Sequence, residues 1–210
     1  PSNEIKKRFI DNFQIQKISI LQDTRFVQIQ NRIEEGQDIP LLNKLPYNKT
    51  ITLGSIDEKD WDIIYESISN ESKLSSRLII VPHEINNKFI NKIYRDIEEL
   101  NLSVKRFTDI NNDDRLDCII YNKVGDLLDI YKYGSLAYVG CGFTGGVHNV
   151  LEPALQGCYV SYGPNISLLD EAVKLRNKSL SKTIKTSKDF TDFINTKQIL
   201  CFIENKALFN

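Results

Sequence analysis

One segment of the chain combines residue types that are suited to binding an anion. Four glycines fall within the seven residues from Gly140 to Gly146, directly after a short apolar run, and glycine lets the backbone approach a ligand closely. A helix is expected to begin next, and the free N–H groups of a first helical turn favour a phosphate. In that turn, the Glu152 carboxylate could accept hydrogen bonds from a ribose diol. A flexible turn followed by a capping acid would look the same, so the loop alone leaves both interpretations open.

The chain has two histidines, His83 and His148, and each directly follows or closely follows an expected strand. A histidine at this edge of a sheet could donate to a phosphate or to a sugar carboxylate, whereas a lone histidine is more often a structural hydrogen-bond donor. Glu84 would offer a third ligand for a metal. The spacing matches no helix-borne zinc motif, so we expect no metal.

Two further segments lie where strands are expected to end. The Ser55 hydroxyl and a backbone N–H after Gly54 could bind an anion, although this position could equally belong to a helix start that Asp57 caps. Val124–Asp126 opens a later helix. An acid in a first turn also favours the helix dipole without any ligand, so this segment supports a structural role as well as a binding role.

Short apolar runs alternate with longer amphipathic segments along the chain. The expected strands are Ile18–Leu21, Thr50–Leu53, Leu78–Val81, Val104–Phe107, Cys118–Tyr121, Leu136–Val139 and Tyr159–Tyr162. The expected helices are Phe26–Glu35, Asp57–Ser69 (with Asp57 as N-cap), Asn86–Leu100, Gly125–Tyr133, Val150–Gln156, Leu168–Arg176 and Lys188–Thr196, with Pro40–Asn48 as a loop. This alternation predicts an α/β fold, a Rossmann-like doubly wound parallel sheet with helices on both faces. Ligands of such sheets bind at the carboxyl ends of the strands.

Composition narrows the class of protein. The 210 residues include 27 basic and 28 acidic residues, for a formal net charge of -1, so no overall positive field favours a nucleic-acid partner. No two of the four cysteines are spaced as C-x-x-C. We therefore expect buried free thiols in a reducing compartment rather than a zinc ribbon or disulfides. No apolar stretch approaches the roughly 20 residues that span a bilayer.

The chain begins with Pro1 and contains no methionine, so we expect it to be a piece of a longer protein. The charged residues 1–17 are expected to be a remnant or linker of a preceding domain. Residues 18–210 are expected to form a nucleotide-sugar-binding domain.

An ordered set of short motifs over about residues 20–176 resembles the C-terminal domain of the 3-deoxy-D-manno-octulosonic acid (Kdo) transferases. The matching motifs are Asp23–Phe26 (DTRF), Gly54–Ser55 (GS), Val81–Glu84 (VPHE), Tyr121–Leu128 (YNKVGDLL), Gly146–Ala154 (GVHNVLEPA) and Tyr162–Asn165 (YGPN). Three positions depart from the family pattern. Asp126 replaces the usual glutamate, Asn122 stands where aspartate is common, and Ile56–Asp57 replaces the residues that usually follow the glycine-serine pair.

This resemblance implies the C-terminal half of a two-domain GT-B glycosyltransferase that transfers Kdo from CMP-Kdo to a lipid A precursor in lipopolysaccharide biosynthesis. Carried over by position, the CMP contacts fall on Pro82, His83, Val124, Gly125, Asp126, Asn149, Val150, Leu151 and Glu152. Phosphate or sugar contacts are expected at Gly54, Ser55, Gly142, Gly145, Gly146 and His148.

The resemblance also places the general base, an acidic residue, in the N-terminal domain. We therefore expect no catalytic residue in this chain, no metal cofactor, and no sugar transfer by the chain alone. The acceptor and the cytoplasmic face of the bacterial inner membrane would be reached through the N-terminal part. Two alternatives stay open: another sugar-nucleotide enzyme of GT-B architecture, such as a UDP-sugar transferase or epimerase, or a non-catalytic nucleotide-binding module.

Overall fold

The computed structural model describes residues 3–13, 17–18, 24–44, 49–71, 74–112, 114–166 and 169–196. The chain forms two compact units, Pro1–Glu35 and Gly36–Asn210. The first unit contains helices α1 (Asn3–Phe13) and α2 (Thr24–Glu35). The strand expected at Ile18–Leu21 lies mostly outside the described residues, and a domain boundary after residue 17 stays a prediction.

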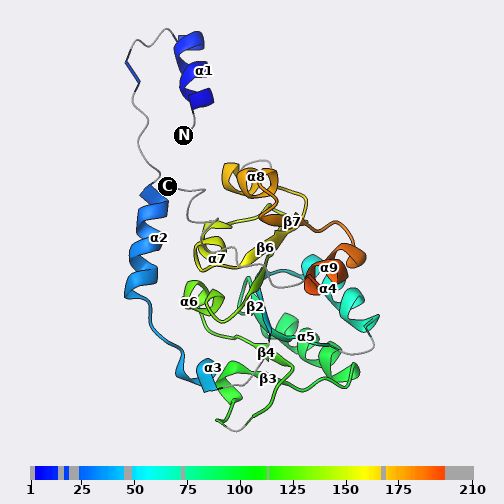
Figure 1. Ribbon diagram of the computed structural model, residues 1–210. Coiled ribbons are helices and arrows are strands. Elements are labelled where there is room, and N and C mark those ends of the chain that lie inside the picture. Colours follow the sequence, from blue (N-terminus) through cyan, green and yellow to red (C-terminus); the bar gives the residue numbers. More distant parts are fainter. Residues whose placement is uncertain are drawn as a thin grey trace. The chain divides into compact units, whose positions relative to one another are not determined.

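The second unit is built on a parallel sheet (Figure 1). In the described residues this sheet has seven strands, in the order β3-β4-β2-β1-β5-β6-β7. Every neighbouring pair is parallel, as a doubly wound sheet requires. The strands are β1 (Thr50–Ile56), β2 (Arg77–Pro82), β3 (Val104–Arg106), β4 (Cys118–Ile120), β5 (Leu136–Val139), β6 (Tyr159–Tyr162) and β7 (Ser181–Thr183). The α/β fold class predicted from the sequence is confirmed.

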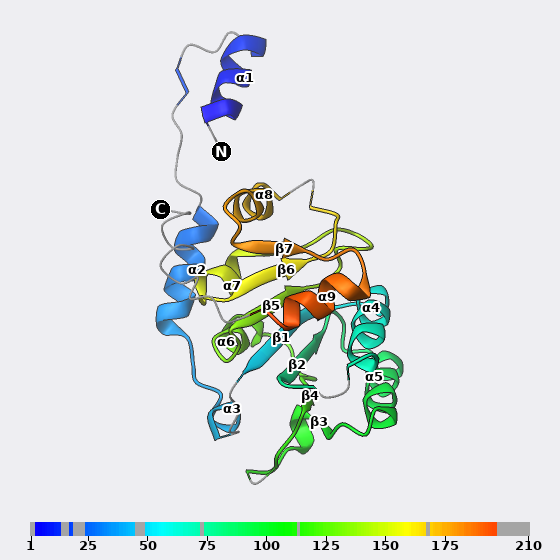
Figure 2. The ribbon, with the colours of Figure 1, turned by 45° about the vertical axis from the view of Figure 1, so that its right-hand side comes forward.

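Helices cover both faces of this sheet (Figure 2). One face carries α4 (Glu58–Ser69), α5 (Asn87–Glu99) and α9 (Ser187–Ile194), whose apolar side chains join a single core cluster with the strands. The other face carries α3 (Pro40–Lys44), α6 (Leu127–Tyr131), α7 (Leu151–Leu155) and α8 (Asp170–Asn177). A short 3-10 helix, η1 (Phe107–Asp109), follows β3.

The central strand β2 shows why its sequence is a continuous apolar run. Leu78 and Ile80 point into the core beneath α4 and α5, whereas Ile79 and Val81 belong to the core on the α3 and α6 side. All four side chains are buried. A parallel strand that is covered on both faces has no solvent-facing position for a polar residue.

Two local predictions were wrong, and one strand was missed. The segment Pro40–Asn48, expected to be a loop, begins with the helix Pro40–Lys44, because proline at a first helical position loses no needed hydrogen bond. Helix α6 is shorter than predicted, since Gly125 adopts a φ of 106° and cannot continue a right-handed helix. The edge strand β7 was not predicted, because its sequence Ser-Lys-Thr has no apolar residue.

Candidate functional site

The candidate site lies where β1 and β5 end side by side in the middle of the sheet. From β1 the chain passes to β2 on one side, and it returns to β5 on the other side. The connections on the two sides therefore diverge at this point. The resulting crevice at the carboxyl ends is where doubly wound sheets bind ligands.

Two of the four non-glycine residues with positive φ in the described part of the chain lie at this crevice. The register between β1 and β2 shifts between Gly54 and Ile56, and the intervening Ser55 has a φ of 55°. Directly after β5, Cys141 has a φ of 63°. Non-glycine residues in this region are uncommon and are often held there at functional sites. A Cβ on Gly140 would lie 2.2 Å from the Ser55 carbonyl oxygen, so the two strand ends are packed backbone to backbone.

The fully buried carboxylate of Asp60 holds the two strand ends in place. Its Oδ1 accepts from the Tyr138 hydroxyl at 2.6 Å, and its Oδ2 accepts from the backbone N–H groups of Cys141 at 2.6 Å and Asp57 at 3.1 Å. The Asp57 side chain accepts in return from Asp60 N, which completes a capping box at the start of α4. Burial raises the pKa of the Asp60 carboxyl to about 6, although its hydrogen bonds act in the opposite direction.

The glycine-rich loop after β5 folds back onto the loop after β6. Asn165 N–H donates to the Gly142 carbonyl at 3.0 Å, and Val147 N–H donates to the Asn165 carbonyl at 3.2 Å. A Cβ on Gly142 would lie 2.6 Å from the backbone of Gly163. The loop therefore has a defined conformation, and of its three glycines expected to contact an anion, only Gly145 has open space around it.

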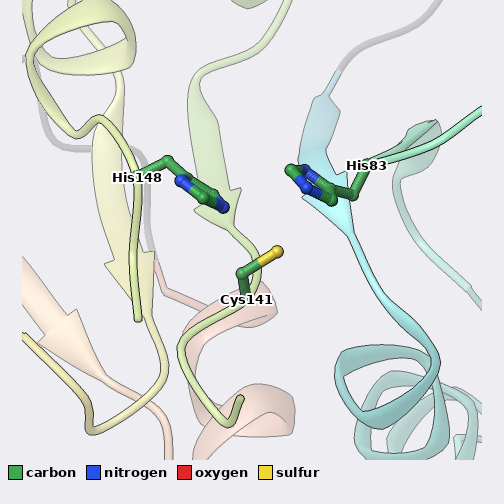
Figure 3. Close-up of side chains that lie close together, drawn as sticks. All are labelled: His83, Cys141 and His148. Carbon is green, nitrogen blue, oxygen red and sulfur yellow. The ribbon is translucent and has the colours of Figure 1, made fainter. Parts of the chain in front are cut away.

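The two predicted histidines come together at the mouth of the crevice (Figure 3). Their imidazole rings stack with centroids 4.9 Å apart and an interplanar angle of 6°. His83 follows Pro82 at the end of β2, and the backbone N–H of His83 donates to the Ile56 carbonyl at 2.9 Å. His148 lies in the loop before α7, and both side chains are exposed. Beside His83 there is a hollow of about 250 Å³ lined by Ile56, Asp57, Glu58, His83, Glu84, Asn86 and Phe89.

The segment Asn149–Glu152 is arranged differently from the expectation of a helix start with free N–H groups. The Asn149 side chain accepts from Leu151 N at 2.9 Å and Glu152 N at 3.4 Å, so it caps α7 itself. Val150 and Leu151 are buried in the core. Glu152 is half-buried in the first turn. The pKa of the Tyr131 hydroxyl is raised well above its usual value, first by burial and then by the charge of Glu152.

The predicted contacts after β4 lie on a more open segment. Val124 is 84% exposed, and no atom lies within 4 Å of a Cβ placed on Gly125. Asp126 accepts from the Tyr121 hydroxyl at 2.5 Å. Burial, and then this hydrogen bond, raise the pKa of Tyr121. Helix α6, which Asp126 precedes, packs against both β1 and α7, so this segment belongs to the same edge of the sheet as the crevice.

Sequence reasoning missed two residues of the site. The sequence pattern places Asp60 within a helix and gives it no further role. It predicts Cys141 as a buried free thiol, without a place in the site. Cys118, Cys141 and Cys158 are buried and free, as predicted. The spacing Asp57-x-x-Asp60 is the one signal that could have found Asp60, because an acid three residues after an N-cap is typical of a capping box. Cys201 lies outside the described residues.

The fold is that of the C-terminal domains of glycosyltransferases. The chain superposes on the C-terminal CMP-Kdo binding domain of WaaA from Acinetobacter baumannii with a TM-score of 0.60 at 18% identity, covering 89% of this chain and 93% of that one. It also superposes on the C-terminal domain of a glycosyl transferase group 1 family protein (LpcC) from Francisella tularensis, with a TM-score of 0.52 at 11% identity, covering 80% and 85%. No family model matches the sequence.

In sequence, the chain is similar to 3-deoxy-D-manno-octulosonic acid transferases. It is 27% identical to the one from Chlamydia muridarum over 141 residues, which are 65% of this chain and 32% of that protein. It is 34% identical to the one from Aquifex aeolicus over 118 residues, which are 54% and 31%. The chain spans about a third of the length of these relatives. The resemblance to Kdo transferases is confirmed. No helix among the described residues has the length and apolar character needed to span a membrane.

Proposed function

We propose that this chain is the donor-binding domain of a Kdo transferase, and that it binds CMP-Kdo for transfer of Kdo to a lipid A precursor in lipopolysaccharide biosynthesis. The observation that carries the proposal is that two motifs far apart in the sequence, Val81–Glu84 and Gly146–Ala154, meet at one crevice. There the rings of His83 and His148 stack with centroids 4.9 Å apart. The sequence similarity to Kdo transferases supports the same donor.

The chemistry that fits this site is an inverting transfer in which CMP leaves. As the bond to the sugar breaks, negative charge grows on the phosphate of CMP while the sugar becomes oxocarbenium-like. Preorganised donors aimed at that phosphate stabilise the transition state. His83 and His148 would supply side-chain donors, and Gly145 would supply approachable backbone. Glu152 would accept from the ribose hydroxyls.

The remaining roles belong to the N-terminal domain of the proposed enzyme. A general base there would deprotonate the acceptor hydroxyl, and the acceptor and the cytoplasmic face of the inner membrane would be reached through that domain. Transfer would need no metal. On this proposal, the chain alone binds nucleotide and transfers no sugar.

Calorimetry with CMP, UMP and UDP, each in the presence of a chelator, tests the proposal. CMP should bind with the highest affinity. Equal or tighter binding of uridine nucleotides would instead favour a UDP-sugar transferase or epimerase, and no nucleotide binding at all would overturn the proposal. Incubation with CMP-Kdo and a lipid A precursor should give no transfer, and a measurable rate would place the general base within this chain.

A further inference from the structure

The two histidines do not stand alone at the crevice, because a sulfur atom lies beside them. Imidazole nitrogens of His83 and His148 and the Sγ of Cys141 all lie within 4.8 Å of one another. The three side chains come from three separate segments, the ends of β2 and β5 and the loop before α7, and the sulfur points toward the two rings (Figure 3). We propose that His83, Cys141 and His148 form a binding site for a zinc-class divalent cation.

The donor atoms suit this class of cation. Zn²⁺ prefers imidazole nitrogen and thiolate sulfur, and open zinc sites use three protein ligands in a tetrahedral arrangement. Hard cations such as Mg²⁺ prefer oxygen ligands. Within the described part of the chain, neither imidazole has a hydrogen-bond partner, so their nitrogen lone pairs are not engaged by other groups described in the structure.

Closing the site requires only small movements. Both histidine side chains are exposed, so their rings can turn to bring the nitrogens to the roughly 2.0–2.1 Å that Zn²⁺ requires. The sulfur makes one weak contact, with the Ser55 carbonyl at 3.4 Å. Its thiol must release a proton to solvent when the metal binds, and burial raises the pKa of that thiol to about 12. The thiol is therefore protonated at neutral pH, and metal binding should release one proton from it and grow stronger as the pH rises.

A second group of potential ligands shares the same sulfur but fits a cation less well. Asp57, Asp60 and Cys141 also place ligand atoms within 4.8 Å of one another. Both oxygens of Asp60 already accept hydrogen bonds, from Tyr138 and from two backbone N–H groups. A cation there would have to break the network that holds the ends of β1 and β5, whereas a cation at the histidines breaks none of it.

A three-ligand site leaves a fourth position open to water or an anion. The site also shares His83 and His148 with the proposed nucleotide contacts, so the cation and a nucleotide cannot bind independently. The cation site itself does not depend on the proposed function. It can therefore be tested with metal alone, without nucleotide.

Titration of the 210-residue chain with Co²⁺, followed by absorption spectroscopy, tests the site directly. We expect one Co²⁺ per chain, visible bands of a four-coordinate ion and a sulfur-to-cobalt charge-transfer band, all reversed by Zn²⁺. His83→Ala and His148→Ala should each lower the affinity at least about tenfold, because even the loss of a group that only orients a metal ligand costs about 10–100-fold. Both side chains are exposed, so these variants are expected to fold.

Cys141→Ser should abolish the charge-transfer band. If that variant does not fold, the sulfur-to-cobalt band of the unsubstituted chain, and its loss in His83→Ala and His148→Ala, still test sulfur ligation beside the two histidines. Asp62→Asn, an exposed carboxylate on α4 that pairs with Lys92, is the control and should leave the spectrum and affinity unchanged. Asp57→Asn separates the two groups of ligands. Loss of affinity in Asp57→Asn with none in the histidine variants would overturn the proposal, as would a Co²⁺ spectrum without sulfur ligation. CMP binding measured with a chelator present tests the proposed function separately. Neither outcome of the metal titration changes the result expected there.

Discussion

The crevice between β1 and β5 and the segment after β4 were both predicted to contact the nucleotide, yet the protein builds them in different ways. At the crevice, Asp60 receives hydrogen bonds from Tyr138, Cys141 and Asp57, and the packing around Gly140 leaves no space for a side chain. After β4, Val124 is 84% exposed and Gly125 has open space around it. The first region is fixed by the protein's own contacts, while the second offers exposed backbone.

This difference indicates how the two regions would contribute to binding. A surface that is held in place before the ligand arrives loses little entropy on binding, so its contacts add fully to affinity. Substitutions at the packed strand ends of the crevice should therefore change folding as much as binding. Substitutions after β4 should change binding with little effect on folding.

The largest effect is expected for Gly140→Ala. The added Cβ would lie 2.2 Å from the Ser55 carbonyl oxygen and 2.6 Å from Asp60 Oδ2, so the backbone of two central strands must move. We expect the free energy of unfolding to fall by about 3 kcal/mol or more, measured by urea denaturation. Gly145→Ala, in the same loop but with nothing within 4 Å, should change it by less than about 0.5 kcal/mol. Equal effects would show that the crevice is not rigid.

Asp60→Asn should reveal a pH dependence of stability that originates in the crevice. The folded pKa of Asp60 is about 6, above its ordinary value of 3.8, so the folded state favours the protonated acid. Its contribution to stability is complete below about pH 3.8 and is lost as pH rises through about 6. At 1.36 kcal/mol per pKa unit, the wild-type chain should lose about 2–3 kcal/mol relative to Asp60→Asn over this range.

Asparagine suits this test because it can keep the network. Its oxygen can accept from Cys141 N and Asp57 N while its amide donates to the Tyr138 oxygen. Urea denaturation at several pH values measures the difference between the two proteins. Asp62→Asn, on the exposed part of the same helix, is the control for removing one carboxylate. A difference in the free energy of unfolding between the two proteins that stays constant from about pH 4 to pH 7 would contradict a raised pKa.

The sequence predicts those strands whose own residues record that they are buried. Strands β1, β2, β5 and β6 are recognisable because each is covered on both faces and is therefore largely apolar. Strand β7 is not recognisable, because an edge strand needs few apolar residues. Its position depends on pairing with β6, which no local pattern records.

The site is predictable in part for the same reason. His83 and His148 stand out because the chain has two histidines and each follows an expected strand, and the glycine-rich loop stands out because four glycines fall within seven residues. Asp60 and Cys141 do not, because their roles arise when α4 packs beside β5 and brings together residues 81 positions apart. The stacking of the two histidines also depends on strand order, since β2 and β5 are separated in the sheet by β1.

Glu152→Gln tests the binding role of a residue at the border of the crevice. If Glu152 holds the ribose, removing its charge should lower CMP affinity about tenfold, which corresponds to about 1.4 kcal/mol, measured by calorimetry. The melting temperature should change little, because a carboxylate in a first turn contributes only about 0.3–1 kcal/mol through the helix dipole. The charge of Glu152 also raises the pKa of Tyr131, so Glu152 could serve the structure instead of the ligand. Unchanged affinity with reduced stability would make Glu152 a structural acid.

After β4, Gly125→Ala should disturb folding much less than Gly140→Ala does. The φ of 106° at Gly125 is unfavourable for an L-residue, but the Cβ would meet no atom within 4 Å, so only backbone strain of about 1 kcal/mol should appear in urea denaturation. The same methyl group would stand on the surface that the nucleotide is proposed to approach, so CMP affinity should fall more than stability does. Val124→Ala is the control for folding, because truncating an exposed side chain should change stability by less than about 0.5 kcal/mol. If Gly125→Ala unfolds the chain as strongly as Gly140→Ala, the segment after β4 is as tightly constrained as the crevice. If it leaves CMP affinity unchanged, the nucleotide contacts the crevice without this segment.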